Sequence, residues 1–211
     1  MSNTCGKFVT LEGSEGVGKT TSLNFIKAYL ESQGHNVVIS REPGGTPLAE
    51  EIRNLLLAER SEAVEEDTEL LLMFAARCQH VSQVIKPALE KGHWVLCDRF
   101  VDASYAYQGG GRGIPFSKIN QIESFCLGDF NPDLTILLDM SVEEGIARTK
   151  KRGAADRFET EKMDFYHRIR QAYLRRAKED AIRMKIVDAA PSVEIVQASI
   201  ELVLQDFCQK N

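Results

Sequence analysis

The sequence predicts an α/β fold: a three-layer α/β/α sandwich around a five-stranded parallel sheet. Five short apolar runs recur at wide spacing along the 211 residues, and helical patterns lie between them. Several of these runs are almost continuously apolar, which is typical of strands that helices cover on both faces of a parallel sheet. Because this length fits one compact unit, we expect a single domain over residues 1–211.

The expected elements follow from the apolar pattern. The five strands are predicted at Phe8–Leu11, Val37–Ser40, Trp94–Cys97, Leu134–Leu138 and Lys185–Val187. The helices are predicted at Thr20–Glu31, Leu48–Leu57, Thr68–Ile85, Phe116–Phe125, Val142–Lys151, Glu161–Asp180 and Val193–Phe207. Ser141 is a typical N-cap, and Pro87 should end or kink the third helix.

Bulk composition argues against several classes of protein. The net charge of −5 argues against general binding to nucleic acid or to an anionic membrane. The longest apolar run, Leu70–Ala76, is too short to span a bilayer, and the N-terminus lacks a signal-peptide core. Five scattered cysteines without C-x-x-C spacing indicate a reducing compartment and no zinc site. We therefore expect a cytoplasmic protein with neither a nucleic-acid nor a membrane partner.

A glycine-rich loop between the first strand and the first helix is the most specific motif. Residues 13–20 read Gly-Ser-Glu-Gly-Val-Gly-Lys-Thr, which is the P-loop pattern G-x-x-x-x-G-K-[ST] in its strand–loop–helix context. Backbone N–H groups of such a loop bind phosphate at a helix N-terminus, Lys19 adds positive charge, and the Thr20 hydroxyl binds Mg²⁺. The sequence thus predicts a P-loop NTPase type of domain that binds a nucleoside triphosphate with magnesium. The expected binding residues are Gly13, Ser14, Glu15, Gly16, Val17, Gly18, Lys19, Thr20 and Thr21.

Two further motifs indicate a second ligand. Arg41 directly follows the second strand, where ligands collect in open α/β sheets, and Pro43 lies two residues further on. Its guanidinium suits a phosphate, although a turn with a solvated arginine is equally consistent with this stretch. Phe74 and Arg77 share a helix face and suit a base, although spacing alone favours a core phenylalanine and a surface ion pair.

The third strand ends in Asp98, the Walker-B arrangement that commonly holds Mg²⁺, and Arg99 follows it. An ordinary acidic residue at a strand end is the alternative. Downstream, Ser104, Tyr105, Tyr107 and Gln108 precede three glycines, which indicates ligand contacts on a mobile segment or else a glycine-rich surface loop.

A basic segment at about residues 148–160 interrupts two helical patterns and contains Arg148, Arg152 and Arg157. Mobile arginines that close over a γ-phosphate would supply charge and exclude water. A solvated charged face is the alternative.

Together these motifs closely resemble bacterial thymidylate kinases, over roughly residues 8–176. The resemblance rests on the loop at 13–20, Arg-Glu-Pro-Gly-Gly-Thr at 41–46, Phe-Ala-Ala-Arg-x-Gln-His at 74–80, Asp-Arg-Phe at 98–100, the tyrosine- and glycine-rich run at 104–112, and Arg-Gly-x-x-Asp-Arg-x-Glu at 152–159. It implies transfer of the γ-phosphoryl group of MgATP to dTMP, giving dTDP and ADP for dTTP synthesis, by a homodimer.

The resemblance also implies roles for single residues. Glu15 bonds the 3′-hydroxyl of the acceptor, Arg41 and Arg99 bind its phosphate, and Asp98 serves the metal. The base and sugar site comprises Pro43, Phe74, Arg77, Ser104, Tyr105, Tyr107 and Gln108, with Phe74 stacked on thymine and Tyr107 in the space of a ribose 2′-hydroxyl. Arg148 lies near adenine. Some relatives carry a catalytic arginine in the loop; this chain has Gly16 there, so it resembles the type that places it in the lid, here Arg152 and Arg157.

The sequence also bears on two other functions. A kinase for another nucleoside monophosphate, or for a free deoxynucleoside, shares most of these features. A GTPase switch would carry Asn-Lys-x-Asp and Asp-x-x-Gly, and the sequence contains neither pattern.

Overall fold

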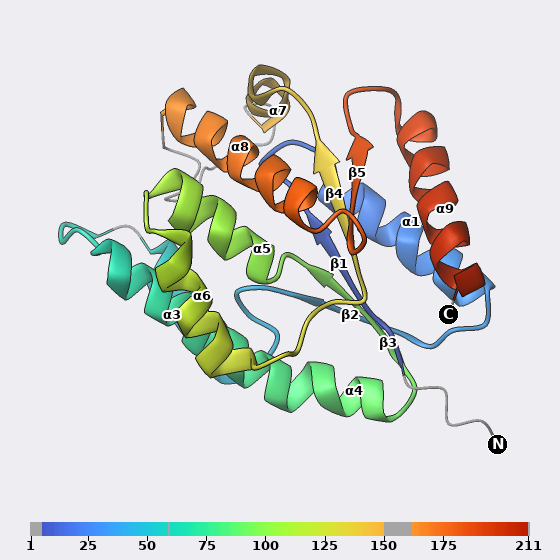
Figure 1. Cartoon of the computed structure of the whole chain (residues 1–211), viewed down its shortest axis with the longest axis horizontal. Coiled ribbons are helices and arrows are strands. Elements are labelled where there is room, and N and C mark those ends of the chain that lie inside the picture. Colours follow the sequence, from blue (N-terminus) through green and yellow to red (C-terminus); the bar gives the residue numbers. More distant parts are fainter. Residues whose placement is uncertain (1–5, 59, 150–161, 211) are drawn as a thin grey trace.

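The computed structural model describes residues 6–58, 60–149 and 162–210. Its centre is one five-stranded sheet with the strand order β2-β3-β1-β4-β5, and every neighbouring pair is parallel (Figure 1). The strands are β1 (Phe8–Glu12), β2 (Val37–Arg41), β3 (Trp94–Asp98), β4 (Leu134–Asp139) and β5 (Met184–Asp188). The predicted fold class and all five predicted strands are confirmed.

The helices of the described residues alternate with these strands. They are α1 (Lys19–Ser32), α2 (Pro47–Leu57), α3 (Glu66–His80), the π-helical segment η1 (Val81–Ile85), α4 (Lys86–Glu90), α5 (Val101–Ser104), the π-helical segment η2 (Tyr105–Gly111), α6 (Phe116–Leu127), α7 (Val142–Thr149), α8 (Met163–Glu179) and α9 (Val193–Lys210). No helix in the described ranges is both long and apolar enough to cross a membrane.

Pro87 does not end its helix. The π-helical segment η1 precedes it, and the chain then continues as α4, with Pro87 at the second helical position. Proline has no N–H to donate to the turn before it, and the wider hydrogen bonding of a π-helix lies just where that donor would be needed. Ser141 caps α7 as expected: its Oγ accepts from Glu144 N at 3.4 Å and donates to the Glu144 carboxylate.

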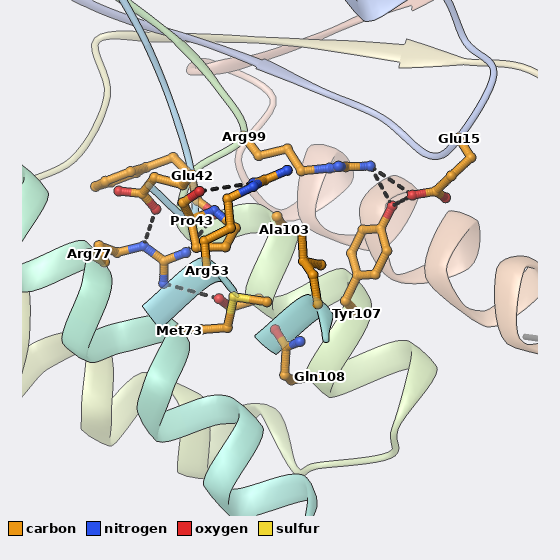
Figure 2. Close-up of a pocket in the computed structure, with 13 residues that line it drawn as sticks. Glu15, Glu42, Pro43, Arg53, Met73, Arg77, Arg99, Ala103, Tyr107 and Gln108 are labelled. Carbon is orange, nitrogen blue, oxygen red and sulfur yellow. Dashed lines mark hydrogen bonds and ion pairs between the residues drawn. The ribbon is translucent and has the colours of Figure 1, made fainter. Parts of the chain in front are cut away.

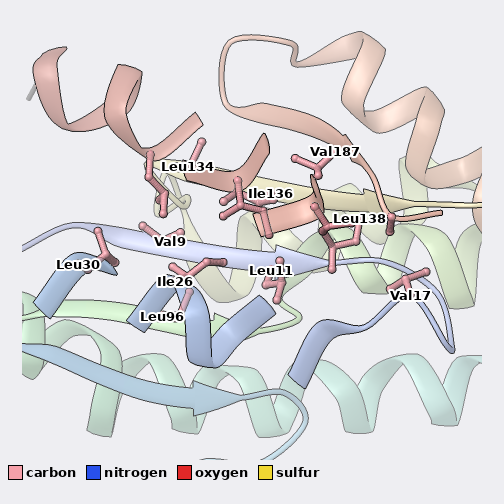
Figure 3. Packing of buried hydrophobic residues seen from close by; sticks show 14 of the residues in the cluster. Val9, Leu11, Val17, Ile26, Leu30, Leu96, Leu134, Ile136, Leu138 and Val187 are labelled. Carbon is pink, nitrogen blue, oxygen red and sulfur yellow. The ribbon is translucent and has the colours of Figure 1, made fainter. Parts of the chain in front are cut away.

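Side chains alternate across the two faces of β1. Val9 and Leu11 pack with Ile26 and Leu30 of α1 in a core that α9 also covers (Figure 3). The other residues of β1 point to the opposite face, which α3, α6 and α8 cover (Figure 1). All five residues of β1 are buried, as expected for the central strand of a three-layer sandwich.

The segment predicted as mobile and glycine-rich, residues 104–112, is instead mostly the helical segment η2 packed against α8. A Cβ on Gly110 would lie 2.6 Å from the backbone oxygen of Arg168, so glycine is what allows the two helices to approach. Arg168 then donates to the backbone oxygens of Gly110 and Gly111 at 3.1 and 2.7 Å. The glycines serve close helix packing, which the local sequence pattern does not reveal.

Candidate active site

The phosphate loop joins β1 to α1 at the carboxyl edge of the sheet. Gly18 caps the helix in a left-handed conformation, and Thr20 and Thr21 lie exposed in its first turn. The Lys19 ammonium curls back over the loop and donates to the backbone oxygens of Gly13 and Ser14 at 3.1 and 3.0 Å. Burial and the positive charge of Arg99 lower the pKa of Lys19 to about 8. The structure therefore places the Lys19 ammonium inside the predicted phosphate loop.

Gly16 has a second reason to be glycine besides its φ of +76°. A Cβ at this position would lie 2.0 Å from the backbone oxygen of Gly145 in α7. The loop thus has no room for any side chain at position 16, including an arginine.

A pocket opens beside the loop, and residues from several elements line it (Figure 2). Most of the predicted acceptor residues are among them. The lining residues are Glu15, Glu42, Pro43, Arg53, Leu57, Met73, Arg77, Arg99, Phe100, Ala103, Ser104, Tyr107 and Gln108.

Glu15, Arg99 and Tyr107 form one hydrogen-bonded group at the end of the pocket nearest the loop (Figure 2). Arg99 Nη2 donates to Glu15 Oε1 at 2.9 Å and to the Tyr107 hydroxyl at 2.6 Å, and that hydroxyl donates to the same Oε1 at 2.5 Å. Burial acts to raise the pKa of Glu15, but Arg99 and Lys19 outweigh it and the net pKa is lowered. Glu15 is therefore a carboxylate, and its Oε2 is buried without a hydrogen-bond partner among the described residues.

Arg77 occupies the opposite wall and is buried. Its Nε donates to Glu42 Oε2 at 2.7 Å, its Nη1 to Ser104 Oγ at 3.0 Å and its Nη2 to the Phe100 backbone oxygen at 3.0 Å. The guanidinium lies 4.6 Å from the ring centroid of Phe74. The predicted pairing of Phe74 with Arg77 is thus present, but Phe74 is 1% exposed and is not among the lining residues.

Besides Phe74, two predicted substrate residues lie away from the pocket lining. The Arg41 side chain is 53% exposed and its Nη2 donates to Glu50 Oε2 at 2.8 Å. Tyr105 donates to the Glu123 carboxylate, and the Arg176 guanidinium lies 4.0 Å from its ring centroid.

Sequence reasoning missed Arg53, which lines the pocket from α2 and donates from Nη1 to the Pro43 backbone oxygen at 2.9 Å. One signal was available: Arg53 and Leu57 are four residues apart, so they share a helix face, and both line the pocket. It also missed Glu69, a buried carboxylate that accepts from Gln108 Nε2 at 2.9 Å.

Asp98 ends β3, and Arg148 lies in the last turn of α7. Asp98 Oδ1 is buried and accepts no hydrogen bond from the described residues. Arg148 donates from Nη1 and Nη2 to the backbone oxygens of Ala189 and Ala190, at 3.1 and 3.0 Å, which holds it against the segment after β5. Arg152 and Arg157 lie outside the described residues.

Known proteins are similar in sequence to this chain over almost its whole length. The family model described as thymidylate kinase matches residues 11–200. The thymidylate kinase of Hahella chejuensis is 56% identical over 195 residues, covering 92% of this chain and 94% of its own. That of Pseudomonas syringae pv. tomato is 52% identical over 204 residues, covering 97% of each chain.

The fold agrees with these sequence matches. A crystal structure of thymidylate kinase from Ehrlichia chaffeensis superposes with a TM-score of 0.77 at 34% sequence identity, covering 95% of this chain and 99% of the other. The phosphate loop, the adjoining pocket and the full-length relatives thus agree, and this chain belongs to the thymidylate kinase family.

Proposed function

We propose that the protein transfers the γ-phosphoryl group of ATP to the 5′-phosphate of dTMP, giving dTDP and ADP. The observation that carries this proposal is the group formed by Glu15, Arg99 and Tyr107, because it joins the ATP loop to the acceptor pocket at hydrogen-bonding distances of 2.5–2.9 Å. A residue of the phosphate loop itself therefore contributes to the acceptor site.

The pocket offers a complementary group for each part of dTMP. Glu15 Oε2 needs a donor, which a 3′-hydroxyl supplies. Arg99 and Arg53, two of the three arginines of the lining, suit the 5′-phosphate. The Tyr107 ring then occupies the space of a ribose 2′-hydroxyl, and Arg77 bonds the base edge. Arg41 joins the phosphate clamp only if it leaves Glu50.

Phosphoryl transfer to an acceptor that is already an anion demands charge compensation more than base catalysis. Lys19 and Arg99 supply fixed positive charge on the donor and acceptor sides. The sequence-based assignment of Arg152 and Arg157 to the transferring group, within a lid at about 148–160, remains part of this proposal. Arg148 is assigned to the adenine, since it lies against the segment after β5.

Mg²⁺ fits the residues present. The orphaned Asp98 Oδ1 is the kind of hard oxygen ligand that the ion prefers, and the exposed Thr20 hydroxyl starts α1 in the standard position for it. Bound there, the ion would neutralise charge on the donor phosphates. We propose that Asp98 and Thr20 hold it, directly or through water.

We further propose a homodimer that works in the cytoplasm. Exposed apolar side chains lie on three helices: Leu55 on α2, Leu71 on α3 and Phe125 on α6, which are 51%, 57% and 89% exposed. α3 packs against both of the others, so a second copy would cover one continuous region. Light scattering tests this, and Leu71→Asp is expected to give monomers.

The cytoplasmic location rests on the cysteines. Free thiols at Cys78, Cys97, Cys126 and Cys208 suit a reducing compartment.

A substrate panel tests the central proposal. Purified protein with MgATP is offered dTMP, dUMP, dCMP, dGMP, AMP and thymidine, and ADP release is followed. Turnover should be greatest with dTMP. Because one methyl group is worth only about 1–3 kcal/mol, dUMP should be a poor but measurable substrate. Turnover with dTMP no higher than with ATP alone would refute the proposal.

A further inference from the structure

Arg99 has an unusual backbone. Its φ is +66°, and it is the only non-glycine residue with positive φ in the described part of the chain. A left-handed conformation is unfavourable for an arginine, so the surrounding structure has to hold it in place. The result is functional, since this backbone directs the guanidinium to Glu15 and Tyr107.

Hydrogen bonds on both sides of Arg99 hold this conformation. Arg99 N donates to the Leu11 backbone oxygen at 2.9 Å, and the next N–H, that of Phe100, donates to Glu12 Oε1 at 2.7 Å. The second bond is the unusual one, because its acceptor is a side chain. Glu12 is fully buried at the end of β1, on the sheet face opposite the α1 core.

The other oxygen of Glu12 is also occupied. Tyr173, on α8, donates its hydroxyl to Glu12 Oε2 at 2.8 Å. Both carboxyl oxygens therefore have one donor each, and Glu12 cannot turn without breaking a buried hydrogen bond. Burying a carboxyl group is costly, and a strand end could pack an apolar residue here, so this arrangement calls for a purpose beyond packing.

We propose that Glu12 is a positioning residue for the acceptor site: by accepting the Phe100 N–H it holds Arg99 in its left-handed conformation and so aims the guanidinium at the acceptor phosphate. The inference rests on the assignment of Arg99 to that phosphate proposed above. Glu12 does not touch substrate. It acts through Arg99, so its removal should weaken recognition of the phosphate more than recognition of the nucleoside.

The test compares dTMP with thymidine, which lacks the phosphate. Calorimetry gives the two dissociation constants for each variant. The Kd for thymidine divided by the Kd for dTMP reports how much the phosphate contributes to binding, independently of the fraction of folded protein. Glu12→Gln keeps an oxygen at the same reach, so its ratio should stay near that of the wild type. Glu12→Asp withdraws the carboxylate from the Phe100 N–H, and its ratio should fall by about tenfold.

Two further variants make the result specific. Tyr173→Phe removes the donor on the other oxygen and leaves the Phe100 bond, so it should keep the wild-type ratio. Arg99→Ala should lower the ratio, and adding Glu12→Asp to it should lower it no further, because the two residues act in series. Equal ratios for Glu12→Asp and Glu12→Gln, or full additivity with Arg99→Ala, would overturn the inference. An unchanged ratio in Arg99→Ala would instead refute the assignment of Arg99 itself.

Discussion

Gly16 of the phosphate loop lies directly beneath Gly145 of α7, so that a Cβ on Gly16 would stand 2.0 Å from the Gly145 backbone oxygen. A chain with an arginine at this position would have to place α7 differently, because backbone atoms cannot yield as a flexible side chain can. In this chain the packing of α7 keeps the loop free of side chains at position 16 and leaves any catalytic arginine to be supplied from elsewhere.

Gly16→Ala should destabilise the fold more than backbone strain alone explains. Gly113 is a matched control, since its φ of +88° resembles the +76° of Gly16 but a Cβ there meets nothing within 4 Å. Gly113→Ala should cost about 1 kcal/mol, and Gly16→Ala about 1–3 kcal/mol more, from the clash. Urea unfolding measures both. Equal losses would show that α7 moves away at little cost.

The buried pair Arg77–Glu42 should matter far more for stability than the exposed pair Arg41–Glu50. The two pairs have similar lengths, 2.7 and 2.8 Å, but Arg77 is 2% exposed and Arg41 53%. Arg77→Met leaves a buried carboxylate without its cation and should cost about 3–5 kcal/mol, whereas Arg41→Met should cost less than about 1 kcal/mol.

The Arg41→Met variant also tests whether Arg41 takes part in binding dTMP. If Arg41 reaches the acceptor phosphate during turnover, Arg41→Met raises the KM for dTMP more than that for ATP, with little loss of stability. An equal effect on both KM values would remove Arg41 from the clamp. The measurement combines steady-state kinetics with urea unfolding on the same preparations.

Tyr107 should contribute through its ring and its hydroxyl separately. Tyr107→Phe removes the donor to Glu15 but keeps the ring, so dTMP turnover should fall while rejection of ribothymidine 5′-monophosphate persists. Tyr107→Ala opens the space and should relax that rejection. The measurement is the ratio of kcat/KM for the two nucleotides, and an unchanged ratio in Tyr107→Ala would contradict the assignment.

ATP binding should take up protons near pH 8. With a pKa of about 8, Lys19 is then roughly half protonated in the free enzyme. The phosphates of ATP favour the charged ammonium and raise this pKa, so binding should take up roughly half a proton at pH 8 and almost none at pH 6. Calorimetry in buffers of different ionisation enthalpy measures the uptake. Lys19→Arg, which stays charged, is the control and should show none of it.

Glu12 should make stability fall as pH rises. Burial and the negative charge of Asp102 raise the pKa of Glu12 from 4.5 to about 8. The folded state therefore holds a proton that the unfolded chain releases, and this contribution is complete below pH 4.5 and lost as pH passes 8. Glu12→Gln cannot titrate, so its stability relative to the wild type should increase between pH 5 and 8.5 in urea unfolding. A constant difference would contradict the raised pKa.

Local patterns predicted the phosphate loop and the strands well, because each depends on about ten consecutive residues. The five apolar runs became the five strands, and every strand boundary lies within one residue of its prediction. The segment 104–112 was predicted wrongly as mobile, because Gly110 and Gly111 are explained only by α8, which approaches from more than fifty residues away.

Side-chain partners were less predictable than elements. The strand-end position of Arg41 suggested a cleft, but Glu50, nine residues later, holds it at the surface. Arg77 was expected from spacing alone to form a surface pair, and instead it is buried on Glu42. The stability of each ion pair depends on the desolvation of both charged groups. That desolvation is set by the helices and strands packed around them.

The sequence by itself determined the fold class, the phosphate loop and the family, because motif chemistry and apolar periodicity are properties of short segments. Only the tertiary structure decided that position 16 must lack a side chain, that Arg53 faces the pocket, and that Arg99 is held in a left-handed conformation. The last of these depends on Glu12, which is 88 residues from the N–H it accepts and 161 residues from Tyr173. Contacts between segments so far apart leave no periodic signal in the chain; they exist only once the sheet has brought those segments together.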